Sequence, residues 1–183
     1  AAVTGAVSAT GSNYHAFAVV TARVQAGGSG TYTVGGIRLT TGAGQYAGWS
    51  LVIVYQDATQ PLRNLNVFNG FARVSSGNPA VTMTISGFVA PQTGPVRTYL
   101  GAVTYEGDKS SGADTYQGDQ FILNTTAVSN TLNPVNDFFN STISNLNATV
   151  TTKNPNYVNQ LGFDIDIIDA SGIIPSGSSS ATV

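Results

Sequence analysis

The stretch "YAGWSLVIVYQDATQPLRN", residues 46–64, contains the only Trp of the chain and its longest apolar run. If residues 49–55 are extended, apolar side chains fill both faces, with Trp49, Leu51, Ile53 and Tyr55 on one and Val52 and Val54 on the other. A strand that is apolar on both faces is normally covered on both sides. We therefore expect a central strand here, with Trp49 and Tyr55 as core anchors rather than as a platform for stacking sugars.

The other apolar segments have the composition of strands. They are rich in Val, Ile, Thr, Tyr and Phe, Gly and Pro interrupt them, and none keeps a helical period. The pattern predicts strands near residues 16–24, 31–39, 49–55, 64–73, 81–88, 96–106, 120–123, 141–151 and 162–168. One short helix is expected at "NPVNDFFNS", where Asn133 can cap a segment that has Pro134 in its first turn. The predicted fold is an all-β, antiparallel β-sandwich of jelly-roll or immunoglobulin-like type, with nine or ten strands and at most one short helix.

Two of these segments alternate regularly. "VTMTISGF", residues 81–88, predicts that Val81, Met83 and Ile85 point inward while the residues between them face water. In "GFDIDIID" the side chains of Asp164 and Asp166 share one face, and apolar side chains fill the other. We interpret the aspartate face as an exposed acidic surface that discourages edge-to-edge pairing.

Composition limits the classes of function. A length of 183 residues predicts one domain, residues 1–183. Only 9% of the residues are charged and 42% are hydrophobic, so solubility depends on neutral hydrogen-bonding side chains. The net charge is −2 and the basic residues are scattered singly from Arg23 to Lys153, which argues against nucleic acid as a partner. No apolar run approaches the roughly 20 residues of a membrane span.

The residues for common catalytic sites are missing from the sequence. There is no Cys, which excludes disulfides, thiolate zinc sites and a Cys nucleophile. The only His is His15, and neither a GxSxG nor an HExxH motif occurs. The single Glu leaves a glycosidase to rely largely on Asp. We therefore expect a protein that is not an enzyme.

A Gly-rich acidic segment, "EGDKSSGADTYQGD", is the candidate metal site. It brings together four carboxylates within a short stretch: Glu106, Asp108, Asp114 and Asp119. Carboxylate and backbone oxygens are the ligands that Ca²⁺ prefers, although the spacing matches no EF-hand. The alternative is a solvated polar loop between strands. Calcium is the only cofactor that the sequence suggests.

Most of the chain resembles a known family. "YAGWSLVIVYQDATQPLRNLNVFNGF", "VTMTISGF", "GAVTYEGD", "FFNSTIS" and "NPNYVNQLGFDIDIIDASGIIPSGSSSATV" occur in this order between Tyr14 and Val183. They resemble a domain that recurs in large secreted bacterial surface proteins of adhesin type, except that Asn69 replaces an acidic residue usual in that family. The resemblance implies an extracellular β-sandwich without known catalysis, and it carries no ligand residues onto this chain.

Two functions follow as expectations. The first is a structural or adhesive module of a cell-surface protein, a fragment or subunit of something longer, because "GSSSATV" ends inside a new alternation. Its partners are neighbouring domains or copies of the same protein, and a fibre can form when a terminal strand is exchanged between subunits. The second is a calcium-dependent module that binds surface glycans, with ligands from 106–119 and an exposed Tyr105 or Tyr116 for stacking.

Overall fold

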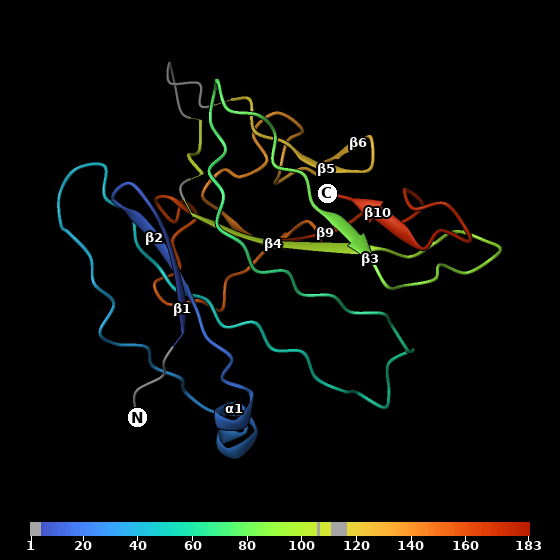
Figure 1. Cartoon of the computed structure of the whole chain (residues 1–183), viewed down its shortest axis with the longest axis horizontal. Coiled ribbons are helices and arrows are strands. Elements are labelled where there is room, and N and C mark those ends of the chain that lie inside the picture. Colours follow the sequence, from blue (N-terminus) through green and yellow to red (C-terminus); the bar gives the residue numbers. More distant parts are fainter. Residues whose placement is uncertain (1–4, 106, 111–116) are drawn as a thin grey trace. The chain divides into compact units, whose positions relative to one another are not determined.

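The computed structural model describes residues 5–105, 107–110 and 117–183 (Figure 1). These ranges contain ten strands, β1 to β10, and one helix, α1. They form one four-stranded sheet and three two-stranded sheets. The prediction of an all-β fold with at most one short helix is confirmed. Within the described ranges, no helix is long and apolar enough to cross a membrane.

The chain divides into two compact units. Unit 1 comprises residues 1–39 and 53–73, and unit 2 comprises residues 40–52 and 74–183. The single domain expected from the length stays a prediction.

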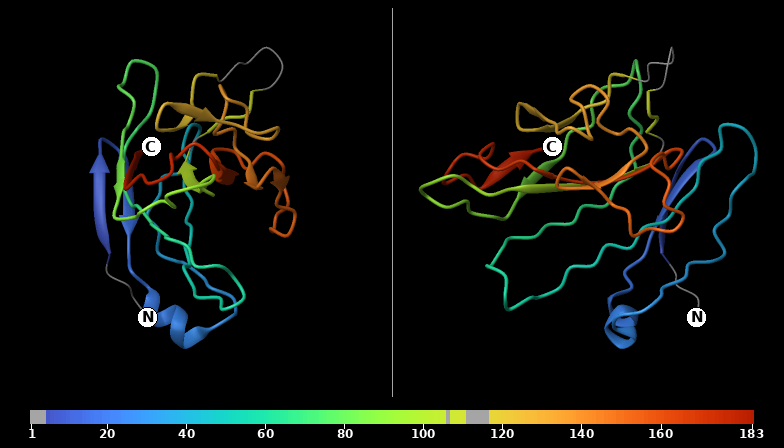
Figure 2. Two further views of the ribbon diagram at one scale, coloured as in Figure 1. Left: turned by 90° about the vertical axis from the view of Figure 1, so that its right-hand side faces the viewer. Right: turned by 180° about the vertical axis from the view of Figure 1, so that it is seen from behind.

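Unit 1 contains a hairpin and the helix (Figure 2). Strands β1, Ala6–Thr10, and β2, Asn13–Phe17, pair antiparallel. Helix α1, Thr21–Gly27, follows and ends at Gly28, which has a φ of 59°. The predicted strand at 16–24 is therefore wrong after Phe17. The segment "TARVQAG" contains Ala, Arg and Gln, which favour a helix, and it is shorter than the window in which a helical period is visible.

Three predicted strands are absent from the described structure. Residues 31–39, 49–55 and 64–73 form neither helix nor strand. The expected core anchors are exposed, with 43% of Trp49 and 74% of Tyr55 accessible to solvent. Strand composition is not sufficient for a strand, because backbone N–H and C=O groups must also meet a neighbouring segment.

The four-stranded sheet of unit 2 has the order β4-β9-β7-β8. Strands β4, Tyr99–Tyr105, and β9, Phe163–Asp169, are its longest and pair antiparallel, with Tyr99 opposite Asp169. Strand β7, Ile143–Asn145, runs parallel to β9, and β8, Ala148–Thr149, returns antiparallel to β7. The expected strand at 141–151 is thus a hairpin. Leu146 and Asn147 both have positive φ at its turn, as a type I′ turn requires.

Two smaller sheets complete unit 2. Strand β3, Thr84–Ser86, pairs antiparallel with β10, Ser180–Thr182, and β5, Phe121–Leu123, pairs with β6, Thr126–Val128. The strand expected at 81–88 is only three residues long in the structure. Val81 and Met83 are exposed and only Ile85 is half-buried, so the predicted inward face of this segment is largely wrong.

The core of unit 2 is built around an aromatic cluster. Phe138 is fully buried, and its ring lies 5.2 Å from the Phe121 ring and 5.0 Å from the Phe139 ring, measured between centroids. Leu123 and Ile168 are buried in the same core. Phe138 lies in the segment for which a short helix is expected. That segment forms turns instead, because the Asn133 side chain does not cap a helix but donates from Nδ2 to the Phe138 carbonyl at 3.2 Å.

Candidate functional site

The predicted calcium loop is described only in part. Glu106 and Asp114 lie outside the described residues, whereas Asp108 and Asp119 are half-buried. Asp119 Oδ2 accepts a hydrogen bond from the Phe139 N–H at 2.6 Å. Within the described ranges, no three His, Cys, Asp or Glu side chains are grouped so that they could hold a metal ion. The calcium site stays a prediction.

A carboxylate that the sequence analysis missed lies near this loop. The two segments are joined by a 2.9 Å hydrogen bond from the Gly118 N–H to the Asn136 carbonyl. Burial raises the pKa of Asp137 and the negative charge of Asp119 acts in the same direction, against hydrogen bonds from Ser110 that lower it. Asp137 is 18 residues from Asp119 in the sequence, so only the pairing of the two loops could reveal it. Its Oδ1 atom is buried without a hydrogen-bond partner among the described residues.

The two aspartates of β9 form a second candidate site, and their predicted exposure is wrong. Asp164 is 0% exposed and Asp166 is 1% exposed. Strand β9 is also not an edge strand, because β4 and β7 lie on its two sides. The aspartate face therefore points into unit 2, together with Ile168 on the same strand face.

Asp164 holds together two segments that are distant in sequence. Its Oδ2 accepts from the Ser141 N–H at 3.0 Å and its Oδ1 from the Thr142 N–H at 2.9 Å. These bonds favour the ionised carboxylate, but burial outweighs them and raises the pKa of Asp164 to about 7. The charge of Asp166 acts in the same direction as burial.

The Ser141 hydroxyl extends this arrangement to two glycines. Its Oγ donates to the Gly107 carbonyl and accepts from the Gly162 N–H at 2.8 Å. A Cβ at Gly107 would collide with the Phe139 carbonyl oxygen and with Asp164 Oδ2. Only glycine allows the backbone at 107 to approach the aspartate this closely.

Asp166 belongs to a chain of polar groups. Ser144 Oγ lies 2.6 Å from Asp166 Oδ1 and 2.9 Å from Asn133 Oδ1. A hydroxyl has one hydrogen, so it cannot donate to both oxygens. If Asp166 is protonated, its O–H donates to Ser144, and Ser144 donates to Asn133. Burial raises the pKa of Asp166, which favours this neutral state.

The buried aspartates of β9 connect segments of unit 2 and are not accessible to a ligand. A carboxylic acid with a raised pKa is a common catalytic group, but a substrate must be able to reach it. Asp164 and Asp166 are closed off from solvent, and their oxygens contact backbone N–H and hydroxyl groups of unit 2. The arrangement joins β7, β9 and the loop at Gly107.

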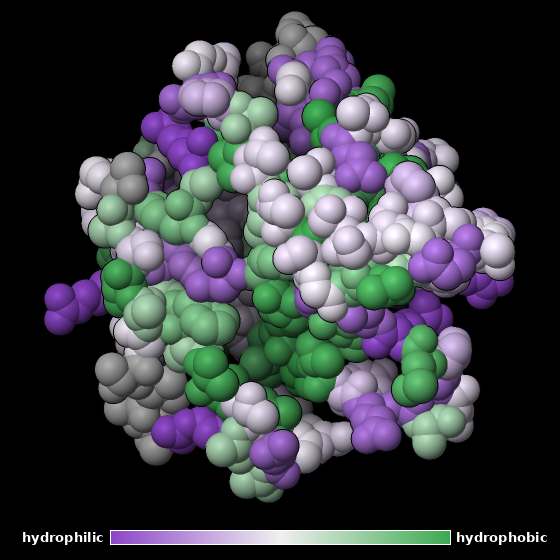
Figure 3. Space-filling view, turned by 45° about the vertical axis from the view of Figure 1, so that its right-hand side comes forward, coloured by the Kyte–Doolittle hydropathy of each residue, from purple (hydrophilic) through white to green (hydrophobic). Residues whose placement is uncertain are grey.

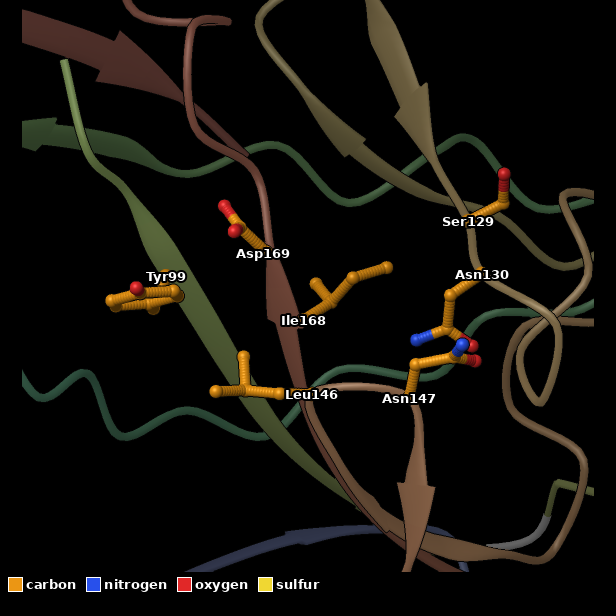
Figure 4. A pocket seen from close by; sticks show the side chains of 7 residues that line it. All are labelled: Tyr99, Ser129, Asn130, Leu146, Asn147, Ile168 and Asp169. Carbon is orange, nitrogen blue, oxygen red and sulfur yellow. The ribbon is translucent and has the colours of Figure 1, made fainter. Parts of the chain in front are cut away.

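An open hollow lies elsewhere on unit 2 (Figure 4). We call it the Tyr99 hollow; it has a volume of about 190 Å³ and is lined by Tyr99, Ser129, Asn130, Leu146, Asn147, Ile168 and Asp169. Asn130 and Asn147 point toward one another at one end, and Tyr99 lies at the other (Figure 4). The hollow is smaller than the roughly 300 Å³ at which small-molecule pockets begin. It suits a single side chain or a similar group.

Of the two tyrosines expected to stack on glycans, Tyr105 lies within the described residues. Tyr105 is exposed over 42% of its surface, and its ring lies 5.2 Å from the Phe163 ring at 58°. Burial of part of the side chain raises the pKa of Tyr105, opposed by a hydrogen bond with Ser50. Tyr116 lies outside the described residues. His15, the only histidine, stacks on Phe71 with a centroid distance of 6.2 Å.

Comparison with known proteins finds no matching protein family, no similar curated protein and no similar solved structure.

Proposed function

We propose that the chain is a non-enzymatic structural or adhesive module of an extracellular cell-surface protein, with neighbouring domains or copies of the same protein as partners. The observation that carries the proposal is the exposure of apolar side chains along segment 53–73 of unit 1, including Ile53, Tyr55 and Phe68. Exposed apolar patches of this kind mark interaction surfaces. The low charge content and the secreted adhesin-type domain that the sequence resembles agree with a surface location.

Imaging and surface labelling test this proposal. We expect electron microscopy of the native protein to show it as part of a fibre or a surface layer, and protease added to intact cells to remove it. A protein that stays inside intact, protease-treated cells would contradict the surface role.

The strand-exchange form of the proposal concerns β10. Within the chain β10 pairs with β3, and on its other side the Thr182 N–H donates to Asn124 Oδ1 at 3.0 Å. Exchange requires β10 to leave these partners. Ile85 and Ala181 lie directly opposite each other, and the chain has no native Cys, so Ile85→Cys with Ala181→Cys can lock the pair. If exchange builds the fibre, the oxidised variant should form none and the reduced variant should form it normally.

The second candidate, a calcium-dependent module for surface glycans, is favoured by the proximity of Asp119 and Asp137 and by the exposed ring of Tyr105. Ca²⁺ would relieve the repulsion between carboxylates. At a hundredfold excess over its Kd it would stabilise the fold by about 2.7 kcal/mol.

We expect glycan-array binding that a chelator abolishes, and a melting temperature that calcium raises by several degrees. Asp108→Asn with Asp119→Asn should remove the shift; equal melts with and without calcium would exclude this function.

A further inference from the structure

The sequence contains a single Asn–Gly pair, Asn69–Gly70, which lies in segment 64–73 of unit 1. Both residues are exposed and belong to neither a helix nor a strand, and the segment is drawn as a plain tube without an arrow in Figure 1. The neighbouring side chains of Phe68 and Phe71 are exposed as well, and Figure 3 shows hydrophobic side chains at the surface of the chain. Unit 1, considered by itself, leaves the pair open to water.

The Asn69 amide and the Gly70 N–H are both unbonded, since no hydrogen bond joins either of them to a residue that the structure describes. A Cβ built at Gly70 would meet no atom within 4 Å. The Asn69 side chain can therefore rotate toward the Gly70 nitrogen, and the backbone at Gly70 can change its conformation without a collision.

The pair Asn140–Ser141 in unit 2 is held in the opposite way. Asn140 is 4% exposed, and its Nδ2 donates to the Leu132 carbonyl at 2.8 Å and to the Asp137 carbonyl at 3.2 Å. The Ser141 N–H donates to Asp164 Oδ2 at 3.0 Å. Both the amide and the N–H that follows it are fixed here, so this pair is an internal control for the free pair of unit 1.

A free Asn–Gly pair allows a reaction between its own groups. The Gly70 nitrogen attacks Asn69 Cγ, where a new C–N bond forms and the Cγ–Nδ2 bond breaks. Ammonia leaves and carries away the proton of the Gly70 N–H. The product is a succinimide ring. Glycine favours the attack because it has no side chain that hinders the approach of its nitrogen.

Water then opens the succinimide at one of its two carbonyl carbons. Opening at Cγ gives aspartate, and opening at the main-chain carbonyl gives isoaspartate, in which the chain runs through the former side chain. In total one water is consumed and one ammonia is released. Nothing is oxidised or reduced, so the reaction needs no co-reactant besides water.

We propose that Asn69–Gly70 is a site of spontaneous covalent modification, at which Asn69 of the folded protein is converted to aspartate and isoaspartate. The conversion adds one negative charge, which changes the net charge of the chain from −2 to −3. Isoaspartate also lengthens the main chain, so the side chains before and after position 69 no longer alternate as in a single strand. This inference concerns the chemistry of unit 1 and does not depend on the surface role.

Peptide mass spectrometry of the full chain tests the inference. Trypsin cleaves after Arg63 and Arg73, so Asn69 lies on the peptide 64–73, whose other two asparagines are internal controls. After incubation of the folded protein in mildly alkaline buffer, we expect the mass change of an amide NH2 replaced by OH. Fragmentation should place it at Asn69 alone, in two products that chromatography separates.

Three variants test the roles of the two residues. Gly70→Ala fits the open space around this position and should slow the modification about tenfold or more, because its methyl group hinders the attacking nitrogen. Asn69→Gln keeps the amide but places it one bond further from the nitrogen, so it should show no change over the same time. Asn69→Asp supplies a standard with the charge and retention of one product. An unchanged rate in Gly70→Ala would overturn the role of the Gly70 nitrogen.

A comparison with unfolded protein tests the contribution of the structure. In guanidinium chloride Asn69 should react at a rate similar to that in the folded chain, whereas Asn140 should begin to react only when the protein is unfolded. If Asn69 reacts in the unfolded chain but not in the folded chain, the fold protects the pair and the proposal is wrong. Absence of any mass change at Asn69 in both states would also overturn it.

Discussion

Units 1 and 2 differ in whether they bury their apolar side chains. In unit 2, Leu123 and Phe138 are fully buried, and so are the polar side chains of Asn133 and Asp164. In unit 1, no residue of described burial is buried, although segments such as 64–73 are as apolar as the strands of unit 2. The apolar content of a segment therefore does not decide whether it enters a core; a neighbouring segment must be available to pack against it.

The difference also concerns polar groups. Unit 2 buries Asp164, Asp166 and Ser141 and joins each of them to a distant segment by hydrogen bonds, with Asp166 Oδ2 left without a partner among the described residues. Such a network fixes the register of β7 against β9, because a shift by one residue would bury a carboxylate without a partner. Unit 1 has no comparable constraint in its described residues, so its order depends on local contacts.

The largest expected effect comes from emptying the core of unit 2. Phe138→Ala should lower the free energy of unfolding by about 3–5 kcal/mol, because it leaves a cavity beside Phe121 and Phe139. Phe71→Ala in unit 1 should cost about 1 kcal/mol or less, because Phe71 is exposed. Urea denaturation of dilute protein measures both. Equal losses would show that unit 1 has a core of its own.

The sequence predicted the paired strands of unit 2 best. The range 96–106 contains β4, and 162–168 covers all of β9 except Asp169. The second segment alternates regularly, and both strands are seven residues long. Residues 49–55 and 64–73 have the same composition but no strand, because pairing depends on a partner segment that local sequence does not specify.

Alternation in the sequence could not show which face of β9 is buried. The pattern "FDIDIID" shows that Asp164 and Asp166 share a face, but it does not show which face points inward. The apolar face was the natural choice for the interior. In the structure Ile168 shares the aspartate face and is buried, while Ile167 on the other face is exposed. The groups that satisfy the aspartates, near Asn133 and Ser141, are more than 20 residues away, so they could be recognised only after folding.

The buried acid of unit 2 should make its stability depend on pH. Asp164 has an ordinary pKa of 3.8, and burial raises it to about 7 in the folded state. Between these values the folded state binds more protons than the unfolded state, so the free energy of unfolding falls as pH rises from about 4 to 8, by on the order of 3 kcal/mol. Burial of Asp166 acts in the same direction.

Urea denaturation at several pH values measures this dependence. Asp164→Asn does not titrate, so the variant should show a shallower decline toward pH 8. It should also be less stable than the wild type at pH 4, because its amide nitrogen cannot accept one of the two backbone N–H groups that the carboxyl oxygens accept. A wild type that becomes more stable over this range would contradict the raised pKa.

A glycine substitution gives a smaller contrast between the units. Gly107→Ala places a Cβ against the Phe139 carbonyl and Asp164, so backbone must shift and we expect a loss of about 1–3 kcal/mol. Gly70→Ala in unit 1 meets no atom within 4 Å. It should be neutral or slightly stabilising, because alanine restricts the unfolded chain. Melting curves of the two variants measure the contrast, and a similar loss for both would contradict it.

The smallest effect on the isolated chain is expected at Leu62. Its side chain is fully exposed, so Leu62→Ser should change the free energy of unfolding of dilute protein by less than about 0.5 kcal/mol. Val19→Ser removes another exposed apolar side chain of unit 1 and should behave in the same way. Urea denaturation of the two variants and the wild type measures these differences. A loss of about 1 kcal/mol or more for Leu62→Ser would show that this side chain packs against the rest of unit 1.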